Sequence, residues 1–424
     1  MPSTELLANA PWADHARSPR VTRVTTFVTA PAGPALVVVQ VETSEPGLIG
    51  WGCASNPQRP LAIRTVIDEY LGPLLVGRAS GDIEDFHQLA ALSPYWRDGA
   101  IENNALAGID LALWDIKGKL AGMPVHQLIG GQVRSHVPVY GHADGRDSGE
   151  VIDGVRRFTE QGYEYVRCQI AIPGADTYGV HGKSDPDLAA RALARNVSWL
   201  PRPYALAVPS MFEDVRAELG PEIELLHDVH ERLDARSALR LSHTLDEFRL
   251  FFLEDALAPE DSGWYPEMRR QSSTPQAVGE IYSSVREFVP LITERLIDFC
   301  RIRMGAIGGL TPTIKLAHLC EFFGVRLALH GPGDVSPIGH AAGLQIDAAS
   351  RSFGIQEAVR HPEAVRDVFP GAPEVVDGRY EVPQTPGLGI EYDEKAGAKY
   401  RIPDPWTLDS WTLLRREDGS VVRP

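Results

Sequence analysis

Short apolar runs alternate with longer mixed stretches along most of the chain. Candidate strands begin near Val137, Glu164, Glu224, Leu250, Gln276, Phe299, Arg326 and Phe353. From Glu224 onward, successive starts are about 26, 26, 23, 27 and 27 residues apart. Such runs are typical of parallel strands buried on both faces, and each interval has room for a crossover helix. Eight units predict a closed barrel, and no GxGxxG turn follows the first strand to favour an open dinucleotide-binding sheet.

The N-terminal region has a different pattern. Residues 21–55 form short alternating runs interrupted by a Pro-Gly turn, which indicates an antiparallel meander. Residues 101–120 carry an apolar stripe at three- and four-residue steps, which predicts a helix. The predicted organisation is an N-terminal extension over 1–20, an α+β capping domain over 21–135, a barrel over 136–375 and a tail over 376–424 that returns to the cap.

One interval in the barrel is unusually long. Residues 171–222 separate the second and third predicted strands and contain clusters of Pro, Gly, Asp and Ser. Loops at the carboxyl ends of barrel strands commonly carry binding residues, so we expect this segment to form a lid or a substrate loop.

Three acidic residues end successive apolar runs at equal spacing. Asp228, Glu254 and Glu280 are separated by 254 − 228 = 26 and 280 − 254 = 26 residues. The carboxyl ends of barrel strands meet at one face, so these side chains are expected to converge there. Oxygen ligands without thiolates favour Mg²⁺. The alternative is that each carboxylate only solvates the rim or caps the next helix.

Other polar residues follow the same rule. His230 lies two residues after Asp228, so strand alternation directs both side chains to one side. Its imidazole is a candidate general acid beside a metal, with a hydrogen-bonded rim histidine as the alternative. His330 and Glu357 end the seventh and eighth strands, which makes them cleft residues.

A candidate base is less well defined. Arg167 closes the second strand, and Tyr178 lies in the loop that follows it. A nearby guanidinium favours the phenolate and lowers the pKa of a tyrosine, which would let Tyr178 accept a proton. The alternative is an ordinary loop tyrosine.

Composition excludes several classes of partner. The net charge of −16, from 41 basic and 57 acidic residues, argues against nucleic acid or an anionic membrane, because both require a positive face. The four cysteines are widely spaced without a CxxC pair, which disfavours a zinc ribbon or a disulfide framework. No signal-peptide pattern occurs in residues 1–20, and no run approaches the roughly 20 apolar residues of a membrane span. We therefore expect a cytoplasmic protein.

The segment Asn103–Asp115, read together with Gly130-Gly131 and the three spaced acids, resembles the enolase superfamily. Further segments look like its mannonate dehydratase subgroup, part of which carries a starvation-sensing label. They are Tyr140–Arg146, Tyr178–Val180, Asp228–His230, Gly308–Thr311 and Phe353–Glu357. The resemblance covers about residues 21–420.

This resemblance implies a specific fold and site. The implied fold is α/β, a modified (β/α)₇β TIM-type barrel under an α+β cap. Asp228, Glu254 and Glu280 would bind Mg²⁺, Tyr178 supported by Arg167 would be the base, and His230 the acid. The implied substrate-binding residues are Asn56, His142, Arg301, His330, Asp334 and Glu357.

The implied reaction is the dehydration of a sugar acid through an enediolate. D-Mannonate would lose the proton at carbon 2 and the 3-hydroxyl, giving 2-keto-3-deoxy-D-gluconate and water. Racemase-like relatives carry Lys-x-Lys at the end of strand two, where this chain has Arg167-Cys168-Gln169, which favours dehydration. The alternatives are a dehydratase for D-gluconate or another aldonate, an epimerase, or a non-catalytic sugar-acid-binding regulator. Relatives are commonly homo-oligomers.

Three segments depart from the subgroup pattern. Residues 181–211 lack the expected aromatic-rich loop, the C-terminal tail lacks terminal tryptophans, and Gly333 stands where threonine is common. These differences affect the substrate fit more than the metal and acid/base residues.

Overall fold

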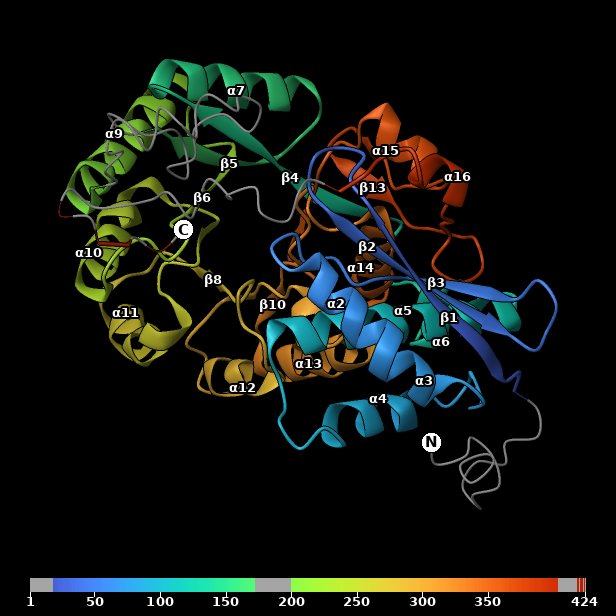
Figure 1. Ribbon diagram of the computed structural model, residues 1–424. Helices are drawn as coiled ribbons and strands as arrows, with labels where there is room; N and C mark the ends of the chain where they lie inside the picture. The colour runs from blue at the N-terminus through green and yellow to red at the C-terminus, as the bar shows by residue number, and fades with distance from the viewer. Residues whose placement is uncertain (1–17, 172–199, 403–417, 419, 422, 424) are drawn as a thin grey trace.

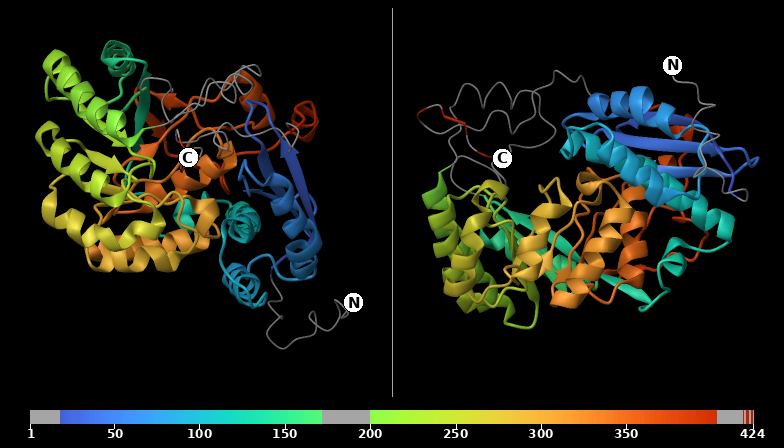
Figure 2. Two further views of the ribbon diagram at one scale, coloured as in Figure 1. Left: turned by 60° about the vertical axis from the view of Figure 1, so that its left-hand side comes forward. Right: turned by 90° about the horizontal axis from the view of Figure 1, so that it is seen from below.

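The computed structural model describes residues 18–171 and 200–402, together with residues 418, 420, 421 and 423. It has two parts, a barrel and a cap (Figure 1). The two further views show that the cap lies along the side of the barrel built from its later units, coloured orange (Figure 2). None of the described helices is long and apolar enough to cross a membrane.

The cap consists of a three-stranded antiparallel sheet and a group of helices. Strands β1 (Val21–Thr29), β2 (Leu36–Thr43) and β3 (Ile49–Cys53) form the predicted meander in the order β1-β2-β3. The helical segments are α2 (Pro60–Val66), the π-helix η1 (Ile67–Leu71), α3 (Gly72–Leu75), α4 (Ile83–Leu92), α5 (Ala100–Ala121) and α6 (Val125–Leu128). Helix α5, the predicted helix, lies directly against β3.

Two glycines allow this close approach. A Cβ atom at Gly52 would lie 1.8 Å from the carbonyl oxygen of Gly108, and one at Gly50 would lie 2.1 Å from that of Ala112. Any side chain would force the helix away from the strand. The backbone contact between β3 and α5 therefore depends on glycine.

Eight parallel strands form the barrel. They are β4 (His136–Gly145), β5 (Tyr165–Ile170), β6 (Glu224–Asp228), β7 (Phe252–Glu254), β8 (Gln276–Val278), β9 (Phe299–Cys300), β10 (Arg326–Leu327) and β11 (Gln356–Glu357). Neighbours in sequence pair in parallel from β4 to β10, and β11 pairs with β4. A parallel bridge between Leu327 and Phe353 links β10 to the approach of β11. The predicted strand starts lie within three residues of the observed ones.

Seven long connections return the chain between strands. Their main helices are α7 (Ser148–Glu160), α9 (Pro201–Leu219), α10 (Ala235–Leu245), α11 (Tyr265–Gln271), α12 (Val285–Thr293), α13 (Leu310–Phe323) and α14 (Pro337–Ala349). Short 3₁₀ helices are η3 (Asp246–Phe248), η4 (Pro259–Trp264) and η5 (Met304–Ile307). Within the interval 171–222, which we expected to form a lid or a substrate loop, Pro201–Leu219 form the crossover helix α9, and residues 172–199 lie outside the described part.

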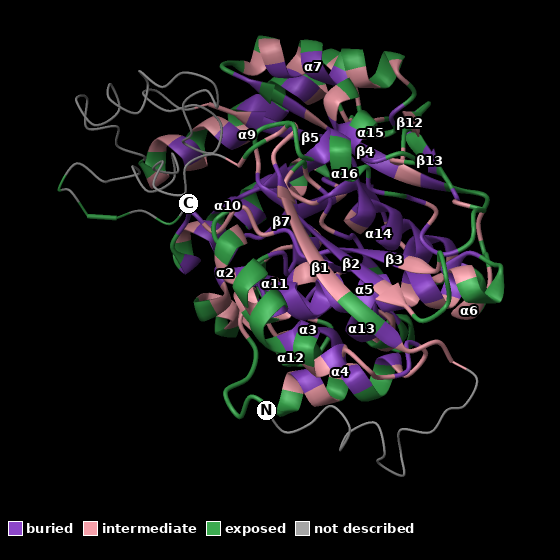
Figure 3. Ribbon diagram, turned by 45° about the vertical axis from the view of Figure 1, so that its right-hand side comes forward, coloured by how far each residue is buried: buried purple, intermediate pink, exposed green. Residues whose placement is uncertain are grey.

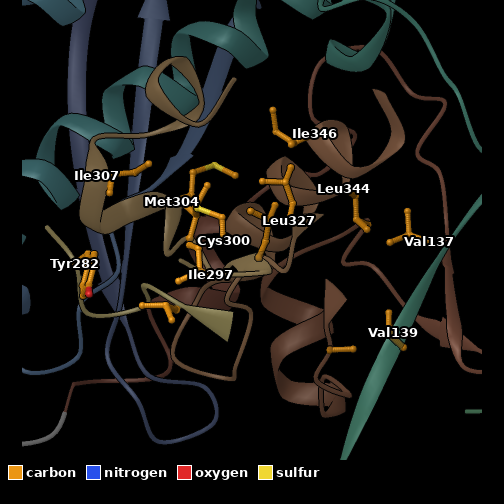
Figure 4. Packing of buried hydrophobic residues seen from close by; sticks show 14 of the residues in the cluster. Val137, Val139, Tyr282, Ile297, Cys300, Met304, Ile307, Leu327, Leu344 and Ile346 are labelled. Carbon is orange, nitrogen blue, oxygen red and sulfur yellow. The ribbon is translucent and has the colours of Figure 1, made fainter. Parts of the chain in front are cut away.

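The barrel interior is a packed core. One layer contains Tyr140, Leu226, Phe252, Ala277, Phe299, Ala328 and Ile355, which come from seven of the eight strand units. A larger core lies between the strands and the outer helices, where Leu327, Cys300 and Leu344 lie close together (Figure 4). In Figure 3 the buried colour follows the barrel strand β5 and helix α14, whereas the exposed colour appears along α7 and α2. A filled interior leaves the strand ends as the place for chemistry.

The chain after the barrel contacts both parts. Helix α15 (Glu363–Val368) follows β11, and β13 (Arg379–Glu381) pairs antiparallel with both β12 (Val375–Val376) and the start of β4. Farther on, before α16 (Glu394–Gly397), the Tyr392 ring packs 5.2 Å from that of Phe27 and 5.5 Å from that of Trp51. The Thr29 hydroxyl also donates to the Gly397 carbonyl at 3.0 Å.

Candidate active site

The three spaced acids lie together at the carboxyl ends of adjacent strands. Asp228 and Glu254 are the last residues of β6 and β7, and they are register partners. Glu280 comes two residues after the end of β8. All three side chains are buried, and Glu254 is fully so. The equal spacing in sequence therefore corresponds to convergence in space.

Two arginines form ion pairs with this group of carboxylates. Arg301 Nε lies 2.7 Å from Glu254 Oε1, and its Nη2 donates at 2.8 Å to both Glu280 and Glu357. Arg167 Nη1 donates to Glu254 Oε1 at 2.9 Å and lies 3.5 Å from Asp228 Oδ2. Because both guanidinium groups are buried, the carboxylates are held in fixed positions from two sides.

Three histidines complete the group. His230 Nδ1 lies 3.3 Å from Asp228 Oδ2 and 3.5 Å from Glu280 Oε1. His330 Nε2 lies 3.5 Å from Glu280 Oε2, and His142 Nε2 lies 3.1 Å from Glu357 Oε1. Each imidazole faces a carboxylate that ends a barrel strand or directly follows one.

The surroundings of the carboxyl groups give them different pKa values. Burial raises the pKa of Glu254 well above its usual value despite the nearby arginines. Burial also opposes ionisation of Asp228, but His230 and Arg167 outweigh it and the pKa of Asp228 is lowered. The pKa of Glu357 is likewise far below its usual value, because Arg301 and His142 overcome the effect of burial. Acids of one type therefore have different proton affinities here.

A fourth acid belongs to the same group of carboxyl groups. Asp255 is buried, and its carboxylate lies with those of Glu254 and Glu280 in a group whose ligand atoms are within 4.8 Å of one another. Burial and then Glu280 raise the pKa of Asp255. Asp228 lies outside that distance group and is joined to it through His230 and Arg167.

This donor set fits an oxygen-ligated divalent cation. Five buried carboxylates, those of Asp228, Glu254, Asp255, Glu280 and Glu357, share two guanidinium groups, Arg167 and Arg301. Among the residues that the structure describes, buried Asp228 Oδ1 has no hydrogen-bond partner. Excess buried carboxylate and an open ligand oxygen are what a hard cation requires.

The remaining predicted residues lie farther out or cannot be placed. Asp334 Oδ2 accepts from Arg303 at 3.0 Å, and Arg303 also donates to the Ser55 carbonyl at 3.1 Å. Asn56, the residue after Ser55, is half-buried, and its side chain accepts from the backbone of Gln58 at 3.2 Å. Arg303 therefore ties the cap loop that carries Asn56 to the barrel loop that carries Asp334. The predicted base Tyr178 falls outside the described residues.

Sequence reasoning missed two members of the site. Asp255 was overlooked because strand alternation directs it away from Glu254, but its φ of 36° turns the chain at that point. Arg303 follows Arg301 by two residues, and this period-two spacing was an available signal. Strand alternation was expected to bring His230 and Asp228 to the same side, but the observed contact has a different cause. Strand β6 ends at Asp228, and φ of 54° at His230 returns its side chain toward that residue.

Two family models match the chain. Residues 9–130 match the mandelate racemase / muconate lactonizing enzyme N-terminal domain, and residues 205–396 match the enolase C-terminal domain-like family. The chain belongs to the enolase superfamily. The predicted capped barrel is therefore confirmed by the family as well as by the structure.

Curated relatives of this superfamily member carry one common name. A "D-galactonate dehydratase family member" from Streptomyces sp. (strain SPB78) is 51% identical over 423 residues, covering 99% of this chain and 96% of the relative. The family member RspA from Pantoea ananatis is 46% identical over 419 residues, covering 95% and 99%.

A solved structure of a relative carries ligands. The crystal structure of an enolase from Pantoea ananatis, described with bound D-gluconate and Mg, superposes with a TM-score of 0.89. It is 45% identical to this superfamily member and covers 96% of this chain and 100% of its own. None of these three names specifies the mannonate dehydratase subgroup, which remains a prediction.

Proposed function

We propose that the protein is a Mg²⁺-dependent hydro-lyase for six-carbon sugar acids, with D-gluconate as its first candidate substrate and D-mannonate as its second. The observation that carries the proposal is the group of buried carboxylates next to the imidazole of His230, in which one Asp228 oxygen has no partner among the described residues. The Mg²⁺ and D-gluconate of the Pantoea ananatis structure support the metal and the class of ligand.

Asp228, Glu254 and Glu280 would hold the ion. When bound, Mg²⁺ supplies positive charge that favours the negative charge developing on the substrate carboxylate as carbon 2 loses its proton. Asp255 contributes from behind, because its Oδ1 accepts from the Gly279 amide at 3.0 Å and so fixes the chain just before Glu280. Three of the acids would thus bind the ion, and the fourth, Asp255, would hold the chain that carries one of them.

We assign the proton steps to Tyr178 and His230. Tyr178, which the resemblance pairs with Arg167, would take the proton from carbon 2, because a nearby guanidinium favours the phenolate. His230 gives a proton to the 3-hydroxyl, which leaves as water, and the resulting enol becomes the 2-keto-3-deoxy acid. Atoms balance, since the aldonate loses only one molecule of water. His230 is suited to this step because its ring is 16% exposed, between the buried acids and solvent.

The residues around Arg301 and Glu357 are proposed to orient the substrate. Arg301 is fully buried and bonded to three carboxylates, so it fixes Glu357 and Glu280 relative to each other. We assign His142, His330 and Glu357 to the hydroxyl groups of the acid sugar, with Asp334 and Asn56 at the outer edge. Arg303, which ties those two loops together, adds rigidity to that edge.

D-Gluconate and D-mannonate differ only at carbon 2, and both give 2-keto-3-deoxy-D-gluconate. D-Galactonate differs from D-gluconate at carbon 4 and gives a different product. Incubating the protein with Mg²⁺ and each acid, then measuring 2-keto acid with semicarbazide, tests the proposal. A keto acid from D-gluconate or D-mannonate supports it. Deuterium at carbon 2 without keto acid indicates an epimerase, and binding without turnover indicates a regulator.

A further inference from the structure

A small cavity lies behind His330, between the cap and the barrel. Its volume is about 30 Å³. It is lined by residues of the cap and of the later barrel units, among them Asn104, His330, His340, Gly343 and Gln356. Asn104 is on α5, His340 and Gly343 are on α14, and Gln356 is in β11. The cavity is therefore a place where the cap helix, a barrel helix and the strand ends meet.

Four buried polar atoms of these lining residues have no partner among the residues that the structure describes. They are Asn104 Oδ1, Gln356 Oε1, His340 Nδ1 and His330 Nδ1. Asn104, His340 and Gln356 are at most 4% exposed, and the His330 side chain is 7% exposed. An unpartnered buried polar atom costs roughly 1–3 kcal/mol, so four around one cavity require an explanation.

Neighbouring contacts make each of the four atoms an acceptor. Asn104 Nδ2 donates to the Ala100 carbonyl at 2.7 Å, and Gln356 Nε2 donates to the Glu357 carbonyl at 2.7 Å, so neither amide can be reversed. His340 Nε2 faces the Gly331 carbonyl at 2.9 Å and must carry the hydrogen there. The same reasoning applies to His330, whose Nε2 faces Glu280.

We propose that this cavity is a binding site for two water molecules that connect the cap helix α5 to the imidazole of His330. A water needs about 10–15 Å³ of such space, so about 30 Å³ holds two. Two waters bring four hydrogens to four acceptors. A water also suits the site better than a cation, because the Arg303 guanidinium lines the same cavity.

The waters give His340, Asn104 and Gln356 a positioning role. His330 Nε2 faces Glu280, and Nδ1 of this cavity-lining residue has no partner among the residues that the structure describes. Hydrogen bonds from an ordered water to Nδ1 therefore fix the ring orientation and its tautomer. That His330 then meets the substrate rests on the proposed function, whereas the water site itself does not.

A crystal structure of the full chain, at a resolution that shows ordered water, is the direct test. Two density peaks within hydrogen-bonding distance of Asn104 Oδ1, Gln356 Oε1 and the two Nδ1 atoms are expected. An empty cavity overturns the proposal. This result does not depend on whether any acid sugar is turned over.

Gly343 provides a matched pair of variants. A Cβ there would lie 3.6 Å from Gln356 Oε1 and 3.5 Å from Leu329 Cδ1, so it enters the cavity without a clash. Gly343→Ala should displace a water and lower Tm, although alanine normally stabilises a helix relative to glycine. Gly343→Ser carries a hydroxyl that can donate to Gln356, so its Tm should be higher than that of the alanine variant. An empty cavity predicts the reverse order, since alanine is the better helix former, and that order contradicts the proposal.

The positioning role has its own measurement. With Mg²⁺ present, Gly343→Ala should bind D-gluconate about fivefold more weakly by calorimetry, and Gly343→Ser should recover part of the affinity. The affinity for Mg²⁺ should not change. Unchanged D-gluconate affinity in a variant that has lost its water overturns the positioning role. If the unmodified protein binds no acid sugar, the proposed function fails, and the water site is judged by the crystal structure alone.

Discussion

Buried carboxylates occur in two parts of this protein, and they are satisfied in different ways. In the cap helix α5, Asp115 accepts from the Trp51 amide at 3.0 Å, the Leu388 amide at 2.8 Å and Lys119 at 2.9 Å. Asp110 accepts from both the amide and the hydroxyl of Thr311. At the barrel mouth, by contrast, acids outnumber cations and an oxygen of Asp228 is left without a described partner.

The comparison separates acids that hold the fold together from acids that are prepared for a ligand. Each oxygen of Asp115 has a donor, so the carboxylate joins the cap strand, the cap helix and the returning tail. Stability is expected to depend on it. At the barrel mouth, Asp228, Glu254 and Glu280 lie close together, and we propose that a bound ion adds the positive charge that balances them. Function is expected to depend on these acids more than stability does.

The largest expected effect is at the barrel mouth. Glu254→Gln keeps the shape of the side chain and an oxygen for Arg301 but removes one negative charge. Dehydration should fall by about 10³-fold or more, because several kcal/mol of charge stabilisation through the ion are lost. Steady-state kinetics and Tm are measured together. Glu213→Gln, at an exposed position, is the control. A Glu254→Gln variant with a much lower Tm but an unchanged specific activity below that Tm would contradict the comparison.

His230 tests the assignment of the acid. His230→Asn should lower kcat by about 10²- to 10⁴-fold, the usual contribution of a general acid. Exchange of the carbon 2 proton with solvent deuterium should continue, because Tyr178 is assigned to that step. Loss of exchange together with dehydration would show that His230 is not the acid of this mechanism.

The cap carboxylate should behave in the opposite way. Both oxygens of Asp115 accept from backbone amides, so Asp115→Asn turns an NH₂ group toward one of these donors and leaves Lys119 paired with the exposed Glu391; the fold should be destabilised by about 3 kcal/mol. Urea unfolding measures this loss. Asp153→Asn, at an exposed pair on α7, should change stability by less than about 1 kcal/mol. A large loss of kcat in folded Asp115→Asn would remove the distinction between the two regions.

The smallest effect concerns a half-buried histidine, His361, outside the proposed site. Burial and the neighbouring His340 lower the pKa of His361 to about 3, so it stays neutral in the fold. The unfolded chain takes up a proton below about pH 6.5, and stability is lost as the pH falls from there toward 3. About 2 kcal/mol should be lost at pH 5. His361→Gln should flatten this part of the profile. If the free energy of unfolding of His361→Gln depends on pH as steeply as that of the unmodified protein, this assignment is wrong.

Much of the fold could be predicted because repetition is visible in sequence. Each barrel unit is an apolar run followed by a helix, so the positions of β6, β8, β9 and β10 were readable to the residue. Helix α9 was missed because Pro201, Pro203 and Pro209 are strong signals against a helix. In the structure the first two lie in its opening turn, and Pro209 is tolerated within it.

The site was readable only where it follows strand ends. Asp228 and Glu254 end strands, and Glu280, His330 and Glu357 belong to the same periodic positions. Asp255 depends on a left-handed residue that alternation cannot anticipate, and Arg303 depends on loops that meet from distant parts of the chain. The local sequence pattern therefore predicts the site residues at strand ends. The residues that surround them become visible only in the tertiary structure.

One measurement tests the central claim most directly. Calorimetric titration of Mg²⁺ into the protein should show one ion bound per chain, and Asp228→Asn should weaken that binding at least tenfold. The open oxygen of Asp228 and the excess of buried acids predict this result. If Mg²⁺ does not bind, or if Asp228→Asn binds it as tightly as the unmodified protein, the carboxylates of the barrel mouth are not the ion site proposed for them.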